Sequence, residues 1–262
     1  MSTKDVLLSV ESGDDYIYYR IQRCDRRVVY ITVKNVEIIP EHDRTHDPSA
    51  LQVLSEIPGW NEIWTTLVIY KKNGRICSKT DISYPHTVPK ESLLPDYPIV
   101  DVSSLNAITR PSFRTSEVSY GDKESYLKIA RFPFELKWIN QEIKAYHALR
   151  KSSLVPGLLG YACESQDYNR VIGFLVEKVN GHHAELEDLQ ACTEALEKLH
   201  GFLIHGDICK YNIIVSSEGP KFIDLEDSVL VDTEKWNIEL RDKERQSMAS
   251  KLADDSGAGR PW

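Results

Sequence analysis

The sequence predicts an α+β fold, because strand-like segments and amphipathic helix patterns occur in different parts of the chain. The first hundred of the 262 residues are rich in Tyr, Val, Ile and Thr, which favour pleated strands. Two later segments repeat apolar residues every three or four positions, the period of a helix with one buried face. With 41% hydrophobic residues, the chain is long and apolar enough to bury its own core.

Several segments of the N-terminal part have the composition of strands. They are residues 16–22, 26–39 and 64–80. Asn73-Gly74 is typical of a two-residue turn, so the last of these segments predicts a hairpin. Four prolines then occur between residues 81 and 98, a density that excludes helix interiors and central strands. We therefore expect residues 1–98 to be a β-rich extension that ends in an irregular connector.

Residues 99–181 predict a second sheet and one helix. The pattern of residues 110–132 indicates two strands joined by a turn near Gly121. Apolar residues at three- and four-residue spacing then predict a helix over 134–152, and apolar strands follow between 158 and 179.

Residues 182–262 predict an amphipathic helix followed by short strands. The helix is expected over 185–200, where acidic residues lead and basic residues trail, as the helix dipole favours. Short apolar strands separated by turn residues follow within 202–226. The charged run 234–246 is interpreted as a solvated helix face with ion pairs between residues four apart.

Charge and hydropathy narrow the classes of function. The formal net charge of -8 disfavours sequence-independent binding to nucleic acid, which needs a basic surface. No stretch approaches the roughly 18 apolar residues of a membrane span, and the N-terminal residues lack a signal-peptide pattern. We therefore expect a cytoplasmic or nuclear protein without membrane contact.

The cysteines and the paired histidines do not indicate a metal or disulfide framework. The five cysteines are scattered and form no CxxC pair, so reduced thiols are expected. His182-His183 lies beside Glu185 in a polar segment that contains glycine, and solvated side chains are the simpler interpretation there.

The densest chemical signal is the segment HGDICKYNIIVSSEGPKFIDLE, residues 205–226. In it Asp207 is followed five residues later by Asn212 and, after a hairpin, by Asp224. Phosphoryl transfer from ATP needs a carboxylate that orients the incoming hydroxyl group and oxygen ligands that hold magnesium. A loop joined by a tight hairpin to Asp224 can bring three such groups to one end of a small sheet.

This segment resembles the catalytic and metal-binding loops of the protein-kinase-like superfamily, in which HxDxxxxN precedes an Asp on a following strand. Gly206 between the His and the Asp, and Glu226 two residues after Asp224, make it closer to aminoglycoside and choline phosphotransferases than to ordinary protein kinases. It also resembles the small atypical Bud32-type kinases. The first hundred residues and the stretches GFLVEK and RPSF are similar to an uncharacterised group of fungal kinase-like proteins, which implies no substrate.

The resemblance implies a role for each residue of the motif. Asp207 would be the catalytic base or the group that orients the acceptor, and His205 would support its loop. Asn212 and Asp224 would be magnesium ligands. Glu226 would be a further metal contact.

The same superfamily requires an upstream lysine for the α- and β-phosphates and a helix glutamate that holds it. Lys128 lies in an apolar strand, where a lone ammonium is costly without a partner. Glu142 of the following helix is the natural partner, and a purely structural ion pair is the alternative. Glu177 to Val179 would be the hinge that presents backbone groups to adenine.

The resemblance covers roughly residues 108–230 and implies a two-lobed, ATP- and magnesium-binding fold. Residues 1–98 would be an extension packed on the small lobe, 99–181 the N-lobe and hinge, and 182–262 a shortened C-lobe with a C-terminal helix. After Asp224 nothing resembles an activation loop or an APE motif, so activity on folded proteins would need a partner that completes the C-lobe.

A second departure from the superfamily is the missing glycine-rich loop. Gly121 is the single glycine between Arg110 and Lys128, where several glycines would let backbone amides approach phosphates. Ser116, Ser119 and the turn around Gly121 are the expected substitutes.

The predicted function is transfer of the γ-phosphoryl group of magnesium-ATP to a hydroxyl acceptor on a protein or a small molecule. The main alternative is a pseudokinase or nucleotide-binding interaction module without turnover. A third interpretation is an incomplete gene product.

Overall fold

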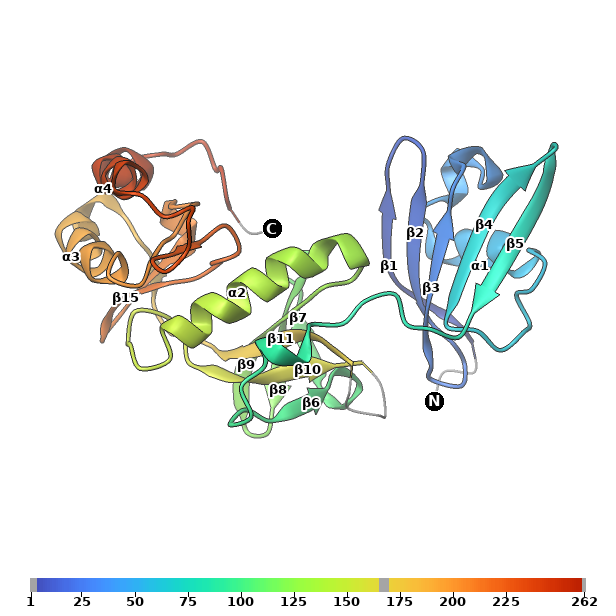
Figure 1. Ribbon diagram of the computed structural model, residues 1–262, viewed down its shortest axis with the longest axis horizontal. Helices are drawn as coiled ribbons and strands as arrows, with labels where there is room; N and C mark the ends of the chain where they lie inside the picture. The colour runs from blue at the N-terminus through green and yellow to red at the C-terminus, as the bar shows by residue number, and fades with distance from the viewer. Residues whose placement is uncertain (1–3, 165–169, 261–262) are drawn as a thin grey trace. The chain divides into compact units, whose positions relative to one another are not determined.

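Strand-forming and helix-forming segments fold into several separate sheets with helices beside them (Figure 1). The computed structural model describes residues 4–164 and 170–260, and these contain four α-helices. This mixed α/β architecture is compatible with the expected fold class. No helix in the described ranges is long and apolar enough to cross a bilayer.

The chain divides into two compact units. The first comprises the described parts of Met1–Thr87, Arg131–Phe134 and Glu164–Arg170, and the second comprises the described parts of Val88–Ala130, Glu135–Cys163 and Val171–Trp262.

The described part of the first unit contains a sheet of five strands in the order β1-β2-β3-β4-β5. They are β1 (Val6–Ser12), β2 (Ile17–Gln22), β3 (Val28–Val33), β4 (Thr66–Lys72) and β5 (Arg75–Asp81). β3 and β4 are parallel and connected through α1 (Asp47–Ser55), whereas the other neighbours are antiparallel. Asn73 and Gly74 have φ of 51° and 76° between β4 and β5, so the predicted hairpin is confirmed.

The core of the first unit combines apolar residues of this sheet with those of α1. Tyr19 of β2, Ile31 of β3 and Leu67 of β4 are buried in it, together with Leu54 of α1 and Trp64.

A buried ion cluster in the first unit is centred on the Glu164 carboxylate. Arg20 Nε donates to it at 2.7 Å and Arg170 Nη1 at 2.9 Å, and the Tyr30 hydroxyl also donates. Burial favours the neutral form of Glu164, but the two guanidinium groups outweigh burial and lower its pKa. The charged groups of this cluster are therefore all paired with one another.

The main sheet of the second unit has the strand order β6-β10-β11-β9-β8-β7. Its strands are β6 (Ile99–Asp101), β7 (Asn106–Thr109), β8 (Thr115–Tyr120), β9 (Lys123–Ile129), β10 (Leu158–Cys163) and β11 (Val171–Glu177). β6 is parallel to β10, and the other neighbours are antiparallel. Helix α2 (Leu136–Ala148) contacts β11.

The remaining elements of the second unit are short. They are α3 (Leu189–Leu199), α4 (Ile238–Leu252), β12 (His182–His183), β13 (Leu203–Ile204), β14 (Ile213–Ser216), β15 (Gly219–Phe222) and β16 (Val229–Leu230). β12, β14 and β15 form one sheet, and β13 pairs with β16. Across both units, 3-10 helices occupy Val36–Ile38, Glu41–Asp43, Lys90–Ser92, Val102–Ser104, Pro133–Glu135, Leu186–Asp188 and Lys210–Asn212.

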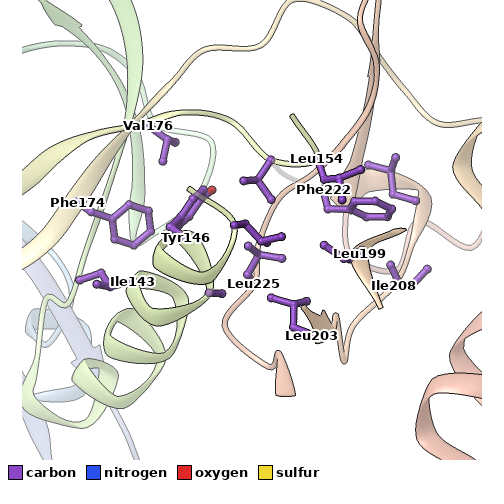
Figure 2. Packing of buried hydrophobic residues seen from close by; sticks show 14 of the residues in the cluster. Ile143, Tyr146, Leu154, Phe174, Val176, Leu199, Leu203, Ile208, Phe222 and Leu225 are labelled. Atoms are coloured by element: carbon purple, nitrogen blue, oxygen red, sulfur yellow. The ribbon is translucent and has the colours of Figure 1, made fainter. Parts of the chain in front are cut away.

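One hydrophobic cluster connects the main sheet of the second unit with its C-terminal elements (Figure 2). Tyr146 of α2 packs against Phe174 of β11, with 5.4 Å between their ring centroids. Leu199 of α3, Phe222 of β15 and Leu225 belong to the same cluster and are fully buried. The strand lysine and the HGD segment are thus attached to one continuous core.

Candidate active site

A buried lysine lies at the centre of the candidate site. The ammonium of Lys128 in β9 is 2.6 Å from Glu142 Oε2 and 3.3 Å from Glu226 Oε2, and it also pairs with Asp224. Burial would lower the pKa of Lys128, but these carboxylates outweigh burial and raise it above the ordinary value. The charge in this apolar strand is therefore compensated by residues from two other parts of the chain.

Glu142 connects the lysine to the segment that follows Asp224. It lies on the buried face of α2 with 2% of its surface exposed, and its Oε1 accepts a hydrogen bond from the Leu225 N–H at 3.3 Å. Burial raises the pKa of Glu142 to about 7, although Lys128 acts in the opposite direction.

Asp224 occupies an unusual backbone conformation. Its φ is 61°, in the left-handed region that residues other than glycine rarely adopt. Such strain persists where the surroundings impose it, and it concentrates at functional sites. Although burial favours its neutral form, the pairing with Lys128 lowers the pKa of Asp224, so its carboxylate is charged.

Hydrogen bonds connect residues 205–212, here called the HGD loop, to the segment before Asp224. The imidazole of His205 is fully buried, with Nε2 3.0 Å from the Ile223 carbonyl oxygen, and its Nδ1 accepts from the Asp207 N–H at 3.3 Å. Burial lowers the pKa of His205, although the carboxylates of Glu244, Asp224 and Asp207 act against this effect. The buried imidazole that joins the two segments is therefore neutral.

Asn212 holds the loop from the other side. Its side-chain Nδ2 donates to the Asp207 backbone carbonyl oxygen at 2.8 Å and to Asp207 Oδ2 at 3.3 Å. The backbone carbonyl oxygen of Asn212 accepts from the Ile223 N–H at 3.0 Å. The Asp207 side chain itself is exposed and accessible to an acceptor.

Gly206 is required by the shape of this loop. Its φ is 89°, and a Cβ atom there would collide with the carbonyl oxygen of Asp227. The glycine between the His and the Asp of the motif therefore allows the loop to pack against the chain that follows Asp224.

Glu244 in α4 is a residue of the site that the sequence analysis missed. Its carboxylate accepts hydrogen bonds from the N–H groups of His205 at 3.2 Å and Gly206 at 2.8 Å, and it is 2.8 Å from His200 Nε2. The interpretation of residues 234–246 as a wholly solvated face is thus wrong at this position. The available signal was spacing, because Met248 and Leu252 follow at four-residue intervals on the same buried face.

The expected hinge lies at the end of β11, beyond direct contact with the lysine. Phe174 is opposite Lys128 in the β9–β11 pairing, so Glu177 lies about 10 Å further along the strand. The Glu177 N–H already donates to the Gly157 carbonyl oxygen at 2.9 Å. Among the described residues, the Val179 N–H has no hydrogen-bond partner and can donate to a ligand.

The loop beside Lys128 differs from the one expected. Lys128 pairs with Thr115 in the β8–β9 hairpin, whereas the turn around Gly121 begins five residues further along, about 17 Å away along the strand. Ser119 and this turn therefore lie at the far end of the hairpin, whereas Ser116 is next to Thr115 and opposite Leu127, close to the lysine. The connection next to Lys128 is the one between β7 and β8, residues 110–114.

Arg114, the last residue of that connection, was also missed. Its Nη2 donates to Glu226 Oε1 at 2.9 Å, and its Nη1 is 2.8 Å from Glu226 Oε2. The guanidinium carbon lies 5.2 Å from the centre of the Trp138 ring. Arg114 therefore brings a second cation to the acidic cluster, from the residue that precedes β8.

The carboxylates around Lys128 fit a hard divalent cation. Ligand oxygens of Glu142, Asp224 and Glu226 all lie within 4.8 Å of one another. Carboxylate and amide oxygens are the donors that magnesium prefers. Asn212 is joined to the residue before Asp224, because its backbone carbonyl oxygen accepts the hydrogen bond from the Ile223 N–H.

Most of the candidate site lies within a range that matches a known protein family. A family model described as the RIO domain matches residues 108–243, just over half of the chain. The matched range contains Lys128, Glu142, Asp207 and Asp224, and it ends one residue before Glu244. No curated protein sequence matches the chain.

Proposed function

The chain belongs to the RIO domain family, an atypical protein-kinase-like family related to Bud32-like kinases, and from this premise we propose that it is an active phosphotransferase. In this proposal it binds magnesium-ATP and transfers the γ-phosphoryl group to a hydroxyl acceptor. The family is generally one of ATP-binding phosphotransferases.

The observation that carries the proposal is the convergence on Lys128 of carboxylates from separate elements. Glu142 comes from α2, and Asp224 and Glu226 come from the segment after β15. A purely structural ion pair needs one carboxylate. Three ionised carboxylates against two cations, Lys128 and Arg114, leave one negative charge in excess in a partly buried place, which favours binding of a further cation.

Each residue has a defined task in this proposal. Lys128, held by Glu142, neutralises charge on the α- and β-phosphates, and Asn212 and Asp224 hold magnesium. A magnesium ion held by these residues would supply positive charge that offsets the charge developing on the phosphates. The hinge at Glu177 and Val179 offers a backbone carbonyl and an N–H to the adenine edge.

The acceptor side depends on Asp207. Its carboxylate aligns the acceptor hydroxyl and takes its proton as the oxygen bonds to the γ-phosphorus and the bond to the β-phosphate oxygen breaks. Positioning and electrostatic stabilisation supply most of the rate in such reactions. The acceptor is a hydroxyl group of a protein or a small molecule.

The lobes are part of the same proposal. Residues 99–181 would form the N-lobe and hinge, 182–262 the short C-lobe, and 1–98 the extension. A protein partner would complete the C-lobe if the acceptor is a folded protein.

The second candidate is a nucleotide-responsive module without turnover. It is favoured by one observation: Lys128 already pairs with Asp224, so these two groups satisfy one another without a ligand. A site closed in this way could bind nucleotide and pass that binding on to a partner without transferring a phosphoryl group.

The test combines binding with turnover in wild type and Asp207→Ala. Magnesium-ATP should raise the melting temperature of both proteins, because the variant keeps Lys128 and Asp224, but γ-phosphate release or autophosphorylation should fall by two or more orders of magnitude in the variant. Asp232→Ala, which removes an exposed acid outside the site, is the matched control and should retain full turnover. Stabilisation without turnover in wild type would support the module instead, and no stabilisation would refute nucleotide binding.

A further inference from the structure

We propose that Arg114 binds the phosphate chain of the nucleotide, and that Glu226 occupies this guanidinium until the nucleotide arrives. The inference rests on the proposed function, because it assigns a ligand group within the same site. It concerns a part of the site for which the sequence offers no glycine-rich loop.

The strand register places Arg114 beside the lysine. Thr115 is paired with Lys128, and the Arg114 carbonyl oxygen accepts a hydrogen bond from the Ile129 N–H at 3.0 Å. Arg114 therefore leads into β8 at the point where β9 presents its ammonium. The connection that ends at Arg114 contains no glycine, so its backbone cannot approach phosphates as a glycine-rich loop does.

The contacts of Glu226 define the position of an anion. Glu226 Oε2 is 2.8 Å from Arg114 Nη1 and 3.3 Å from Lys128 Nζ, so one carboxylate is shared by both cations. A guanidinium presents two parallel donors that fit a carboxylate or a phosphate equally well. A phosphate group can therefore replace the Glu226 carboxylate between these two cations.

The guanidinium is already arranged to bind an anion. Arg114 Nη2 donates to Glu226 Oε1 at 2.9 Å and Nη1 is 2.8 Å from Glu226 Oε2, so both donors point at one carboxylate. The side chains of Arg114 and Glu226 are 21% and 17% exposed, which leaves them accessible to a ligand. The Trp138 ring lies against the guanidinium and keeps its orientation when Glu226 leaves.

Release of Glu226 has a second effect on the site. Its carboxylate lies within 4.8 Å of the Asp224 and Glu142 oxygens, so it can turn toward a metal ion when Arg114 takes a phosphate. One exchange of partners would then supply both a cation for the phosphates and an oxygen for the metal.

The first experiment compares ligands of different phosphate number by titration calorimetry with magnesium. Wild type should bind ATP and ADP more tightly than AMP and adenosine. Arg114→Gln should weaken ATP binding about 10- to 100-fold, as expected for a lost charged hydrogen-bonding group, and leave adenosine binding unchanged. Arg114→Lys keeps the charge but not the two parallel donors, so its ATP affinity should lie between those of wild type and Arg114→Gln. It is the control for a loss of folding, because it is the more conservative change. Arg110→Gln in the same connection should bind ATP like wild type.

The second experiment tests the exchange itself. In the presence of a chelator, Glu226→Gln should bind ATP several-fold more tightly than wild type, because a competing internal anion is removed. A salt bridge with a merely structural role would give no such gain.

The outcomes separate the two proposals. If wild type binds no nucleotide, the proposed function fails. If wild type binds ATP but Arg114→Gln binds it with equal affinity, or loses ATP and adenosine binding equally, the assignment of Arg114 is overturned while the proposed function stands.

Discussion

Gly206 shows how a single residue determines the shape of the candidate site. The positive φ and the nearby Asp227 carbonyl oxygen exclude a side chain at this position. Asp224 adopts a positive φ without being a glycine, so its conformation is imposed by its pairing with Lys128 and by its neighbours. A left-handed backbone therefore occurs on each side of the β14–β15 hairpin, without strain at Gly206 and with strain at Asp224, which belongs to the acidic cluster.

The first prediction concerns Gly206→Ala. We expect it to lower the free energy of unfolding by about 2–4 kcal/mol, since a left-handed backbone and a steric collision add together. Turnover should fall even where the protein remains folded, because the N–H groups of the loop move. Chemical denaturation and phosphate release measure the two effects.

Gly121→Ala is the matched control for this prediction. Gly121 has φ of 60°, but no atom lies within 4 Å of the place that a Cβ would take, so it carries the backbone penalty alone. Equal losses of stability in the two variants would show that the collision at Gly206 is unimportant.

At the scale of elements, α4 is the helix that stabilises the HGD loop. Glu244 projects from it to two consecutive backbone N–H groups, while Met248 and Leu252 anchor the same face in the core. Burial favours the neutral form of Glu244, but His200 and the N–H groups that donate to it outweigh burial and lower its pKa. The helix thus positions the loop that carries Asp207, the residue proposed to align the acceptor.

We predict that Glu244→Gln costs about 1–3 kcal/mol of unfolding free energy at neutral pH, since charged hydrogen bonds to two N–H groups and His200 are weakened. The folded-state pKa lies below the ordinary carboxyl value, so this contribution is present at neutral pH and is lost as the pH falls below about 4.5. The difference between variant and wild type should shrink over that range in denaturation experiments. Glu239→Gln, at the exposed start of α4, should change little.

The elements were predictable to different degrees. Helices α2 and α3 follow from apolar spacing to within a few residues, because their periodicity is local. The partners of Arg114 and Glu244 lie 112 and 38 residues away in sequence, and no local pattern encodes such pairs, although four-residue spacing to Met248 marks Glu244 as facing the core. Of the expected substitutes for the glycine-rich loop, Ser119 and the turn around Gly121 lie at the wrong end of the hairpin and Ser116 lies near Lys128, because the register of β8 with β9 depends on the whole sheet.

At the scale of the whole molecule, the larger of two hydrophobic clusters described in the second unit spans its main sheet and its C-terminal elements, and the smaller one lies within the sheet. The larger cluster runs from Ile143 and Phe174 to Leu199 and Phe222 (Figure 2). The strand that carries Lys128 and the loop that carries Asp207 are therefore packed on the same apolar residues, and their geometry should be lost together.

We predict that Phe222→Ala lowers the unfolding free energy of the second unit by about 3–5 kcal/mol, because the ring is fully buried. Hydrogen exchange should increase in α2 and α3 at the same time. Phe202→Ala, whose ring is 42% exposed, is the control and should have little effect. Faster exchange in α3 alone would show that the cluster is not one cooperative core.

The position of Glu244 matters for the design of shorter fragments of this protein. Residue 243 ends the range matched by the family and lies inside α4, so a fragment trimmed to that range would stop within a helical turn. It would also strip away the only carboxylate that, among the described residues, accepts from the amides at positions 205 and 206. Such a fragment would also lack β6 and the core residues Met248 and Leu252, so its inactivity would not count against the proposed function.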